Sequence, residues 1–301
     1  MVKESHIIDL KTVCECNLCM GCKTWHPQVS LVNLENSSWE ERIVKFEFYT
    51  ILLIESASEQ SAGLGHTEYD YSNATMIFLS PGEVFRLSES ENSPTKGYLL
   101  AFHPDLLKCT PLQNQLYQYS FFNYRKEEAL HLSARETEKI LCCFENMEDE
   151  LHHSVDTHTA TLLSGHIKLL LDYCTRYYER QFITREDIHK KLLERVKKTI
   201  DNYIRSGQLK KGLFPSVESI ADTLGLSASY FTDLLQFETG YTPEEFFQLQ
   251  RIQAARRMLL CSEYTTAEVS HWLGYPSVQY FSLLFKKLTG FAPCEYCHSQ
   301  N

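Results

Sequence analysis

One pattern of residues occurs twice between positions 216 and 293, and this repetition restricts the fold more than any other feature of the sequence. Gly225 and Gly274 lie 49 residues apart, whereas Gly240 and Gly290 lie 50 apart. The first copy contains Ile220-Ala-Asp-Thr-Leu-Gly225-Leu, Tyr230-Phe231, Leu234-Leu235, Thr239-Gly240 and Pro243. The second contains Val269-Ser-His-Trp-Leu-Gly274-Tyr, Tyr280-Phe281, Leu284-Phe285, Thr289-Gly290 and Pro293. A one-residue difference confined to a turn is expected of two copies of one structural unit.

Each copy predicts a short helix, a glycine turn and a longer helix. In the first copy, Ser216 can cap a helix that ends near Thr223, and Gly225 supplies a turn in which positive φ is inexpensive. Ser227 can then cap a second helix with apolar residues at helical spacing, which stops at Gly240. This arrangement is typical of a helix-turn-helix, whose second helix enters the major groove of DNA. Two such units in register are a much stronger signal than one.

Residues 190–298 resemble the DNA-binding domain of the AraC family of bacterial transcription regulators. The residues that carry the resemblance are Ile220-Ala221, Leu224-Gly225, Ser227, Tyr230-Phe231, Glu238-Thr239-Gly240, Arg251, Ala255, Leu259, Leu273-Gly274-Tyr275, Tyr280-Phe281, Phe285-Lys286-Lys287, Gly290 and Pro293. The resemblance implies an all-α domain over residues 184–301, in which a helix near 244–260 joins two helix-turn-helix units. It also implies double-stranded promoter DNA and RNA polymerase as partners.

The resemblance further implies which outward-facing residues contact bases and phosphates. These are Ser229, Thr232, Asp233 and Gln236 in the first copy, and Ser277, Gln279, Ser282, Lys286 and Lys287 in the second. Asp233 and Leu283 stand where arginine is common in the family, so this chain offers few cations to phosphate. We therefore expect a shallow salt dependence of DNA binding. For the two lysines, the alternative is an ordinary solvated helix end.

The charge is unevenly distributed along the chain. Residues 190–301 carry 13 Lys and Arg against 11 Asp and Glu, whereas the remainder carries 16 against 28. An acidic N-terminal part is a poor partner for nucleic acid, so DNA contact is expected only in the C-terminal part. The sequence shows no apolar segment typical of a signal peptide or a membrane span, and it predicts a cytoplasmic protein without a membrane partner. The sequence contains no P-loop, no G-x-S-x-G motif and no cupin-type pair of histidines. We therefore predict that the protein is not an enzyme and holds no cofactor.

Four cysteines lie close together near the N-terminus, at Cys14, Cys16, Cys19 and Cys22. A C-x-x-C pair such as Cys19 and Cys22 ligates zinc or cycles as a redox dithiol. No second pair follows at zinc-finger distance, and incidental reduced thiols are the other interpretation. Both interpretations, a metal or redox sensor and ordinary free thiols, remain open from the sequence.

Residues 29–102 contain several short apolar or alternating segments separated by turn residues, a pattern typical of a β-sandwich or barrel. Met76-Ile-Phe-Leu-Ser-Pro-Gly-Glu83 and Phe102-His-Pro-Asp-Leu106 resemble, more loosely, the cupin-like sensor barrel of AraC-type regulators. We therefore predict an α+β protein with a cupin-like sensor barrel over residues 1–132. Groups available to an unknown small-molecule effector are Arg86, His66, Glu68, Tyr49, Tyr69 and Tyr71. The alternative is that these are ordinary outward-facing strand residues.

Residues 133–183 predict a pair of helices, the first with a capping box at Ser133 and Glu136. The second helix has an apolar face too wide to be buried by one partner surface. In the sensor domains that this region resembles, such a pair forms the dimer contact, which implies a homodimer. Residues 181–185 are predicted to be the hinge that leads to the DNA-binding domain. Two rivals remain: an interaction module that has lost DNA binding, and a cupin enzyme fused to DNA-binding helices.

Overall fold

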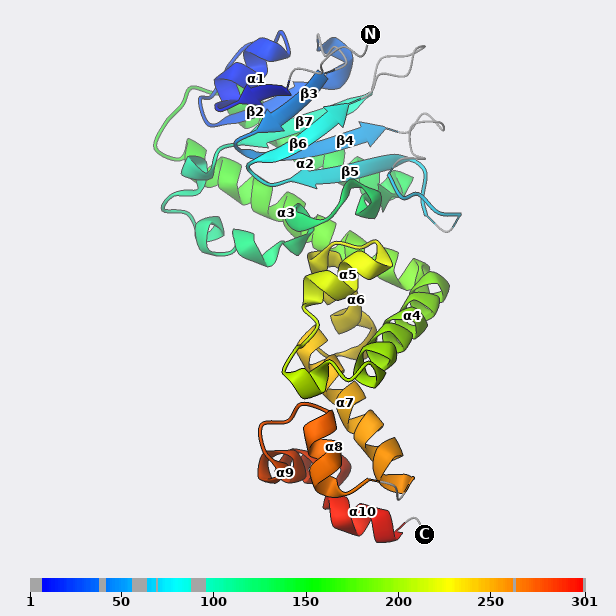
Figure 1. Cartoon of the computed structure of the whole chain (residues 1–301). Helices are drawn as coiled ribbons and strands as arrows, with labels where there is room; N and C mark the ends of the chain where they lie inside the picture. The colour runs from blue at the N-terminus through cyan, green and yellow to red at the C-terminus, as the bar shows by residue number, and fades with distance from the viewer. Residues whose placement is uncertain are drawn as a thin grey trace, which may run out of the picture. The chain divides into compact units, whose positions relative to one another are not determined.

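The structure is a computed structural model that describes residues 7–37, 42–55, 64–68, 70–87, 96–261 and 264–299 (Figure 1). The chain divides into two units, residues 1–185 and residues 186–301. The first unit is rich in β-sheet and the second is helical, which confirms the predicted α+β class at this level. None of the described helices is both long and apolar enough to cross a membrane.

The strands of the first unit form two sheets. A five-stranded antiparallel sheet has the order β2 (Val29–Asn33), β7 (Gly97–Phe102), β4 (Tyr49–Glu55), β5 (Ala74–Leu79) and β8 (Leu130–Leu132). A three-stranded sheet has the order β1 (Ile7–Leu10), β3 (Arg42–Phe46) and β6 (Glu83–Leu87), with β1 parallel to β3. In the part of the chain that the structure describes, these sheets do not close on each other. The described strands therefore form two separate sheets and do not show the predicted closed barrel.

The five-stranded sheet is the middle layer of the unit. Along β4, Leu52 packs with Phe46 of the smaller sheet, whereas Ile51 and Leu53 pack with the helices on the opposite face. Both faces are therefore buried, which explains why β5 is buried at every position instead of alternating between buried and exposed residues.

Two long helices, α2 (Ala134–His152) and α3 (Thr159–Thr184), cover that opposite face. The capping box predicted at α2 is present, because Ser133 accepts from the backbone N–H of Glu136 and the Glu136 carboxylate accepts from that of Ser133. Shorter elements complete the unit: α1 (Val13–Cys19), η1 (Leu34–Asn36), η3 (Pro104–Leu107), η4 (Pro111–Asn114), η5 (Leu116–Gln118), η6 (Ser120–Asn123) and η7 (Lys126–Glu128).

Residues 181–184 of the predicted hinge form the last turn of α3, and the boundary between the two units falls at the end of that segment, between Arg185 and Glu186. That the segment acts as a hinge stays a prediction. Gln181 is fully buried and links this turn to β8: its Nε2 donates to the Ala129 carbonyl at 3.0 Å, and its Oε1 accepts from the His131 N–H at 2.8 Å. Those contacts hold the turn in helical form against the sheet. The next helix, α4, begins at Glu186.

The second unit contains α4 (Glu186–Arg205), η8 (Leu209–Lys211), α5 (Val217–Leu224), α6 (Ala228–Thr239), α7 (Pro243–Leu260), α8 (Thr266–Trp272), α9 (Val278–Thr289) and α10 (Pro293–Ser299). Residues of both copies form one hydrophobic core together with residues of α4 and of α7, the helix that joins the copies. Phe231 of α6 and Phe281 of α9, which are equivalent in the two copies, are both fully buried there. The predicted connecting helix is α7, which runs between the two copies (Figure 1).

Candidate nucleic-acid interface

The first helix-turn-helix is built from α5 and α6 through caps at both helix starts. Ser216 accepts from the backbone N–H of Ser219 at 3.1 Å, and Ser227 accepts from that of Tyr230 at 3.1 Å. Gly225 ends α5 with φ of 77°. These contacts satisfy N–H groups that the first turn of each helix would otherwise leave unpaired. The cap serines and the turn glycine predicted from the sequence are confirmed.

The second helix-turn-helix repeats this construction in α8 and α9. Thr265 accepts from the backbone N–H of Glu268 at 3.2 Å, and Ser277 accepts from that of Tyr280 at 3.1 Å. The turn from Gly274 to Ser277 contains two residues, Tyr275 and Pro276, where the first copy has only Leu226. The one-residue difference predicted from the glycine spacing therefore lies in the turn between the two helices.

Arg251 of α7 links the connecting helix to the second copy. Its Nε and Nη2 donate to the Leu273 carbonyl at the end of α8, at 3.1 and 2.6 Å, and its guanidinium lies 4.0 Å from the centre of the Tyr275 ring. The guanidinium is buried, and burial lowers the pKa of Arg251 below its usual value. A charged donor on the last carbonyls of a helix satisfies its unpaired acceptors. This contact holds α8 in place against α7.

Residues 220–299 match the family model described as a helix-turn-helix domain. The xylose operon regulatory protein of Escherichia coli K12 is 33% identical over 95 residues, which cover 32% of this chain and 24% of that protein. An AraC-like transcription regulator of Streptomyces lividans is 32% identical over 81 residues, which cover 27% of each chain. Residues 220–299 form an AraC-type helix-turn-helix domain.

A further relative, the transcriptional regulator LumQ of Photobacterium leiognathi, is 23% identical over 238 residues, covering 77% of this chain and 86% of LumQ. By contrast, the match spans only about a quarter of the length of the first two relatives. The two shorter matches are 33% and 32% identical, whereas the match that extends over most of the chain is 23% identical.

The predicted contact residues of α6 form a polar face on the AraC-type domain. Ser229, Thr232 and Asp233 are half-buried, and Gln236 is exposed. The Thr232 hydroxyl donates to the Ala228 carbonyl at 2.8 Å, and Gln236 Nε2 donates to the Gly240 carbonyl at 3.0 Å. Both side chains keep an oxygen for other donors, such as the adenine N6 amino group.

The predicted contact residues of α9 form a face of different chemistry. Gln279, Lys286 and Lys287 are exposed, and Ser282 is half-buried. The Ser277 hydroxyl oxygen accepts the helix-cap hydrogen bond, and its proton is left to donate to a DNA acceptor. Whether these nine residues of α6 and α9 contact DNA stays a prediction.

The predicted DNA contacts of α9 did not include its apolar residues, although the structure exposes several of them. Leu283 is 74% exposed, and Val278 and Tyr280 are also exposed. Leu283 lies three positions before Lys286, so both lie on one side of the helix. An apolar side chain on a recognition helix suits the methyl group of thymine. The signal was present in the sequence, because Leu283 falls outside the apolar stripe that contains Phe281 and Phe285.

The predicted effector residues do not form a single site in the described residues. Tyr49 stacks on Phe102 with ring centres 5.3 Å apart and packs toward the helices, whereas Arg86 is exposed on β6 of the smaller sheet. Glu68 and Tyr71 are exposed, and Tyr69 lies outside the described residues. Effector binding by these side chains stays a prediction.

One of them, His66, belongs to a buried polar network that the sequence did not reveal. Its ring lies 5.0 Å from that of His131, and the Nε2 atoms of both are buried without a hydrogen-bond partner among the described residues. Burial lowers the pKa of His131 to about 4, with the charges of Arg185 and His66 acting in the same direction. The ring is therefore neutral near pH 7.

Nearby, Arg185 forms a buried ion pair with Asp70, in which Nη2 and Oδ2 are 2.7 Å apart. Burial raises the pKa of Asp70, but the hydrogen bonds and charge of Arg185 outweigh burial and lower it overall. Arg185 also donates to the Gly65 carbonyl at 3.1 Å. These contacts tie the end of α3 to Gly65 and Asp70. Asp70 and Arg185 are separated by 115 positions, so no spacing rule could have found this ion pair.

The four N-terminal cysteines do not converge on one point in the structure. Cys14 is exposed on α1, whereas Cys16, two residues later and on the opposite side of the helix, is fully buried. Burial, followed by the nearby Cys19 and Cys22, raises the pKa of the Cys16 thiol to about 12. Among the described residues, which include these four, no three His, Cys, Asp or Glu side chains are arranged to hold a metal ion. This geometry gives the predicted metal site no support, and metal binding by the four cysteines stays a prediction.

Proposed function

We propose that this protein is a sequence-specific DNA-binding transcription regulator. The observation that carries the proposal is the pair of capped recognition helices, α6 and α9, which the single helix α7 joins and which both present polar side chains outward. Two recognition helices joined in this way suit two successive major grooves on one face of DNA. Relatives of the AraC-type domain are named as operon regulators, which supports the same function.

In this proposal, α6 uses Ser229, Thr232, Asp233 and Gln236, and α9 uses Ser277, Gln279, Ser282, Lys286 and Lys287. Lys286 and Lys287 contact phosphate near the end of α9. Leu283, which lies between Gln279 and the two lysines along α9, adds an apolar contact to the methyl group of thymine. Because the two faces differ, the bound site is asymmetric.

For the first unit, we propose a cupin-like sensor that responds to a small molecule and dimerises through α2 and α3. Leu162 and Leu169 support the dimer, because they lie seven residues apart on α3 and are 47% and 46% exposed. A homodimer brings two AraC-type domains to one promoter and raises affinity without new contacts in either. RNA polymerase is the partner through which transcription then changes in the cytoplasm.

The test is selection of bound sequences from a random double-stranded DNA library by the full-length protein. The proposal expects enrichment of a site with two different half-sites spaced by about one helical turn, roughly 10 bp. Enrichment of no sequence above the starting library would overturn it.

A second candidate, a protein-interaction module on the same fold, has one observation in its favour. The exposed Val278, Tyr280 and Leu283 give α9 an apolar surface of the kind that protein partners bury. The same selection separates the candidates, because an interaction module would enrich no DNA. In an interaction module, Leu283→Ala would weaken binding to a protein partner.

A further inference from the structure

A pocket of about 400 Å³ lies in the second unit between α4, α7 and α8. It is lined by Asp201, Ile204, Arg205, Ala254, Arg257, Met258, Cys261, Tyr264 and Trp272. No residue predicted to contact DNA is among them. The volume falls in the range of small-molecule sites, roughly 300–1,000 Å³.

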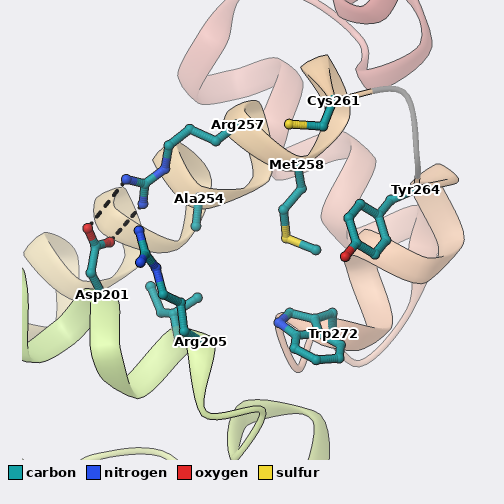
Figure 2. Close-up of a pocket in the computed structure, with 9 residues that line it drawn as sticks. Asp201, Arg205, Ala254, Arg257, Met258, Cys261, Tyr264 and Trp272 are labelled. Carbon is teal, nitrogen blue, oxygen red and sulfur yellow. Dashed lines mark hydrogen bonds and ion pairs between the residues drawn. The ribbon is translucent and has the colours of Figure 1, made fainter.

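The charged side chains gather at one end of this pocket (Figure 2). Arg257 is held by Asp201, with its Nη2 2.7 Å from Oδ1 and its Nη1 3.3 Å from Oδ2. Arg205 points toward the same end, and the structure records no ion pair or hydrogen bond for its guanidinium with any described residue. Because Asp201 neutralises one of the two guanidiniums, this end of the pocket keeps one uncompensated positive charge.

The opposite side of the pocket is apolar and aromatic. Met258, Tyr264 and Trp272 face the cavity there, as Figure 2 shows. Tyr264 is exposed and Trp272 is half-buried, so both rings leave apolar surface in contact with solvent. Ile204 and Ala254, which are buried, complete the apolar lining. A planar apolar group can bury this surface, and a thioether and two aromatic rings are adaptable partners for such a group.

We propose that this pocket binds a small organic carboxylate with a planar aromatic body. The carboxylate pairs with Arg205, whose two parallel N–H groups match it geometrically, and the aromatic body lies against Trp272 and Met258. A cationic ligand is disfavoured because Asp201 already has a partner in Arg257. This site is separate from the DNA-contact faces and from the effector residues predicted in the first unit.

The location gives such a ligand a structural consequence. Its contacts join α4, which packs beside the first copy, to α7 and to α8 of the second copy. Binding therefore stabilises the second unit against unfolding, by an amount that rises with the logarithm of ligand concentration above the Kd. It also adds a contact between α4, α7 and α8 to the core that the two copies already share.

The first test uses Trp272 as the reporter in the full-length chain, with Trp25→Phe and Trp39→Phe removing the other two tryptophans of the sequence. The probe is 2-naphthoate, and 2-naphthamide, which has the same shape and similar absorption but no charge, is the matched control. We expect saturable quenching by 2-naphthoate and about tenfold weaker binding of the amide, as for loss of a charge-assisted hydrogen bond. Equal affinity for the two probes would overturn the proposal.

Variants locate the charge that recognises the probe. Arg205→Met should weaken 2-naphthoate binding about tenfold and leave 2-naphthamide binding unchanged. The control is Arg195→Met, which removes an exposed guanidinium of the same helix outside the pocket and should change neither. If the Arg205→Met protein does not fold, Arg205→Gln repeats the measurement. Unchanged affinity in both Arg205 variants contradicts the assignment, as does tight binding of 2-naphthyl phosphate without binding of 2-naphthoate.

An independent readout uses the pocket thiol. Cys261 is exposed at the pocket, and Cys142 is exposed on α2 in the first unit. Saturating 2-naphthoate should slow alkylation of Cys261 by iodoacetamide several-fold, measured on its peptide by mass spectrometry, without slowing that of Cys142. Equal rates with and without the probe count against the site. None of these outcomes depends on whether the protein binds DNA.

Discussion

The two helix-turn-helix copies agree in what they bury and differ in what they expose. Phe231 and Phe281 occupy equivalent buried positions, and Ser227 and Ser277 cap the second helix of each copy through the same contact at the same distance of 3.1 Å. On the outside, α6 presents hydroxyl, carboxylate and amide groups, whereas α9 presents Leu283 between Gln279 and two lysines. The buried residues are restricted by the fold, and the exposed ones are free to diverge between the copies.

The copies also differ in how closely their turns are packed. A Cβ atom added at Gly225 would meet nothing within 4 Å, whereas one added at Gly274 would lie 2.4 Å from the Leu209 carbonyl oxygen. The second turn is therefore packed against η8, and the first is open. Equivalent residues of the two copies therefore contribute unequally to stability.

The largest effect is expected from Gly274→Ala. Both glycines have positive φ, at 77° for Gly225 and 69° for Gly274, and an L residue there costs roughly 1 kcal/mol. At Gly274 the clash with Leu209 adds roughly 2 kcal/mol. We expect Gly274→Ala to lower the free energy of unfolding by about 3 kcal/mol and Gly225→Ala by about 1 kcal/mol.

The measurement is urea unfolding of the full-length chain, followed by Trp272 fluorescence in the background without the other tryptophans. Trp272 is in α8, so it reports the second unit. If Gly274→Ala and Gly225→Ala lower the free energy of unfolding by similar amounts, the two turns contribute equally to stability and the prediction is wrong.

Next in size is Arg251→Met, which removes the bond from α7 to the end of α8. The Leu273 carbonyl then loses a buried, charged donor, and we expect the free energy of unfolding to fall by about 2 kcal/mol. Arg257→Met is the control on the same helix. Its ion pair with Asp201 is partly exposed, so its loss should cost less than about 1 kcal/mol. Equal costs in the same unfolding assay would contradict the role given to Arg251.

Variants of Lys286 and Lys287 test whether α9 contacts phosphate more strongly than α6. The double variant Lys286→Ala, Lys287→Ala should weaken binding to the selected site about tenfold at roughly 0.1 M salt. It should also reduce the slope of log affinity against log salt by about 2, since each contact contributes about 0.9.

Lys197→Ala, Lys198→Ala is the matched control, because both lysines are exposed on α4, where no DNA contact is predicted. Fluorescence anisotropy over a salt series measures both quantities. An unchanged slope in the α9 variant would show that its lysines are only solvated.

The smallest difference is expected between the two cap serines. Loss of a helix cap costs about 1 kcal/mol. Ser227 is buried and Ser277 is exposed, so water replaces the lost hydroxyl more readily in the second copy. We expect Ser227→Ala to be the more destabilising of the two by roughly 0.5 kcal/mol, in thermal unfolding of the full-length chain. The reverse order would indicate that burial at this position does not set the cost.

The repeated unit could be predicted from sequence because its signals are local. Serine caps, turn glycines and an apolar stripe all act within a few residues, and even the extra residue of the second turn was visible in the glycine spacing. The same kind of signal exists at α1, where Thr12 and Glu15 form a capping box that marks a helix start inside the cysteine-rich segment. That helix separates Cys14 from Cys16, and it explains why four close cysteines do not converge.

The arrangement of the first unit could not be predicted in this way, because its contacts are distant in sequence. Strand β2 pairs with β7, and β5 pairs with β8, across about 50 to 70 residues, so the order of strands and the separation into two sheets have no local signature. The same holds for the ion pair between Asp70 and Arg185. For the predicted DNA-contact faces, the sequence placed the residues outside the apolar stripes of α6 and α9, and the exposure of Leu283 follows from the same local pattern, because Phe281 and Phe285 are buried.

The central claim is that the two copies contact different half-sites. Its most direct test repeats the DNA-library selection with two single variants, Gln236→Ala in α6 and Gln279→Ala in α9, beside the unaltered protein. The account predicts that each variant relaxes base preference in one half of the selected site and leaves the other half unchanged, with the two affected halves about one helical turn apart. If both variants alter the same half, or if neither alters any position, the copies do not divide the site between them and the claim is wrong.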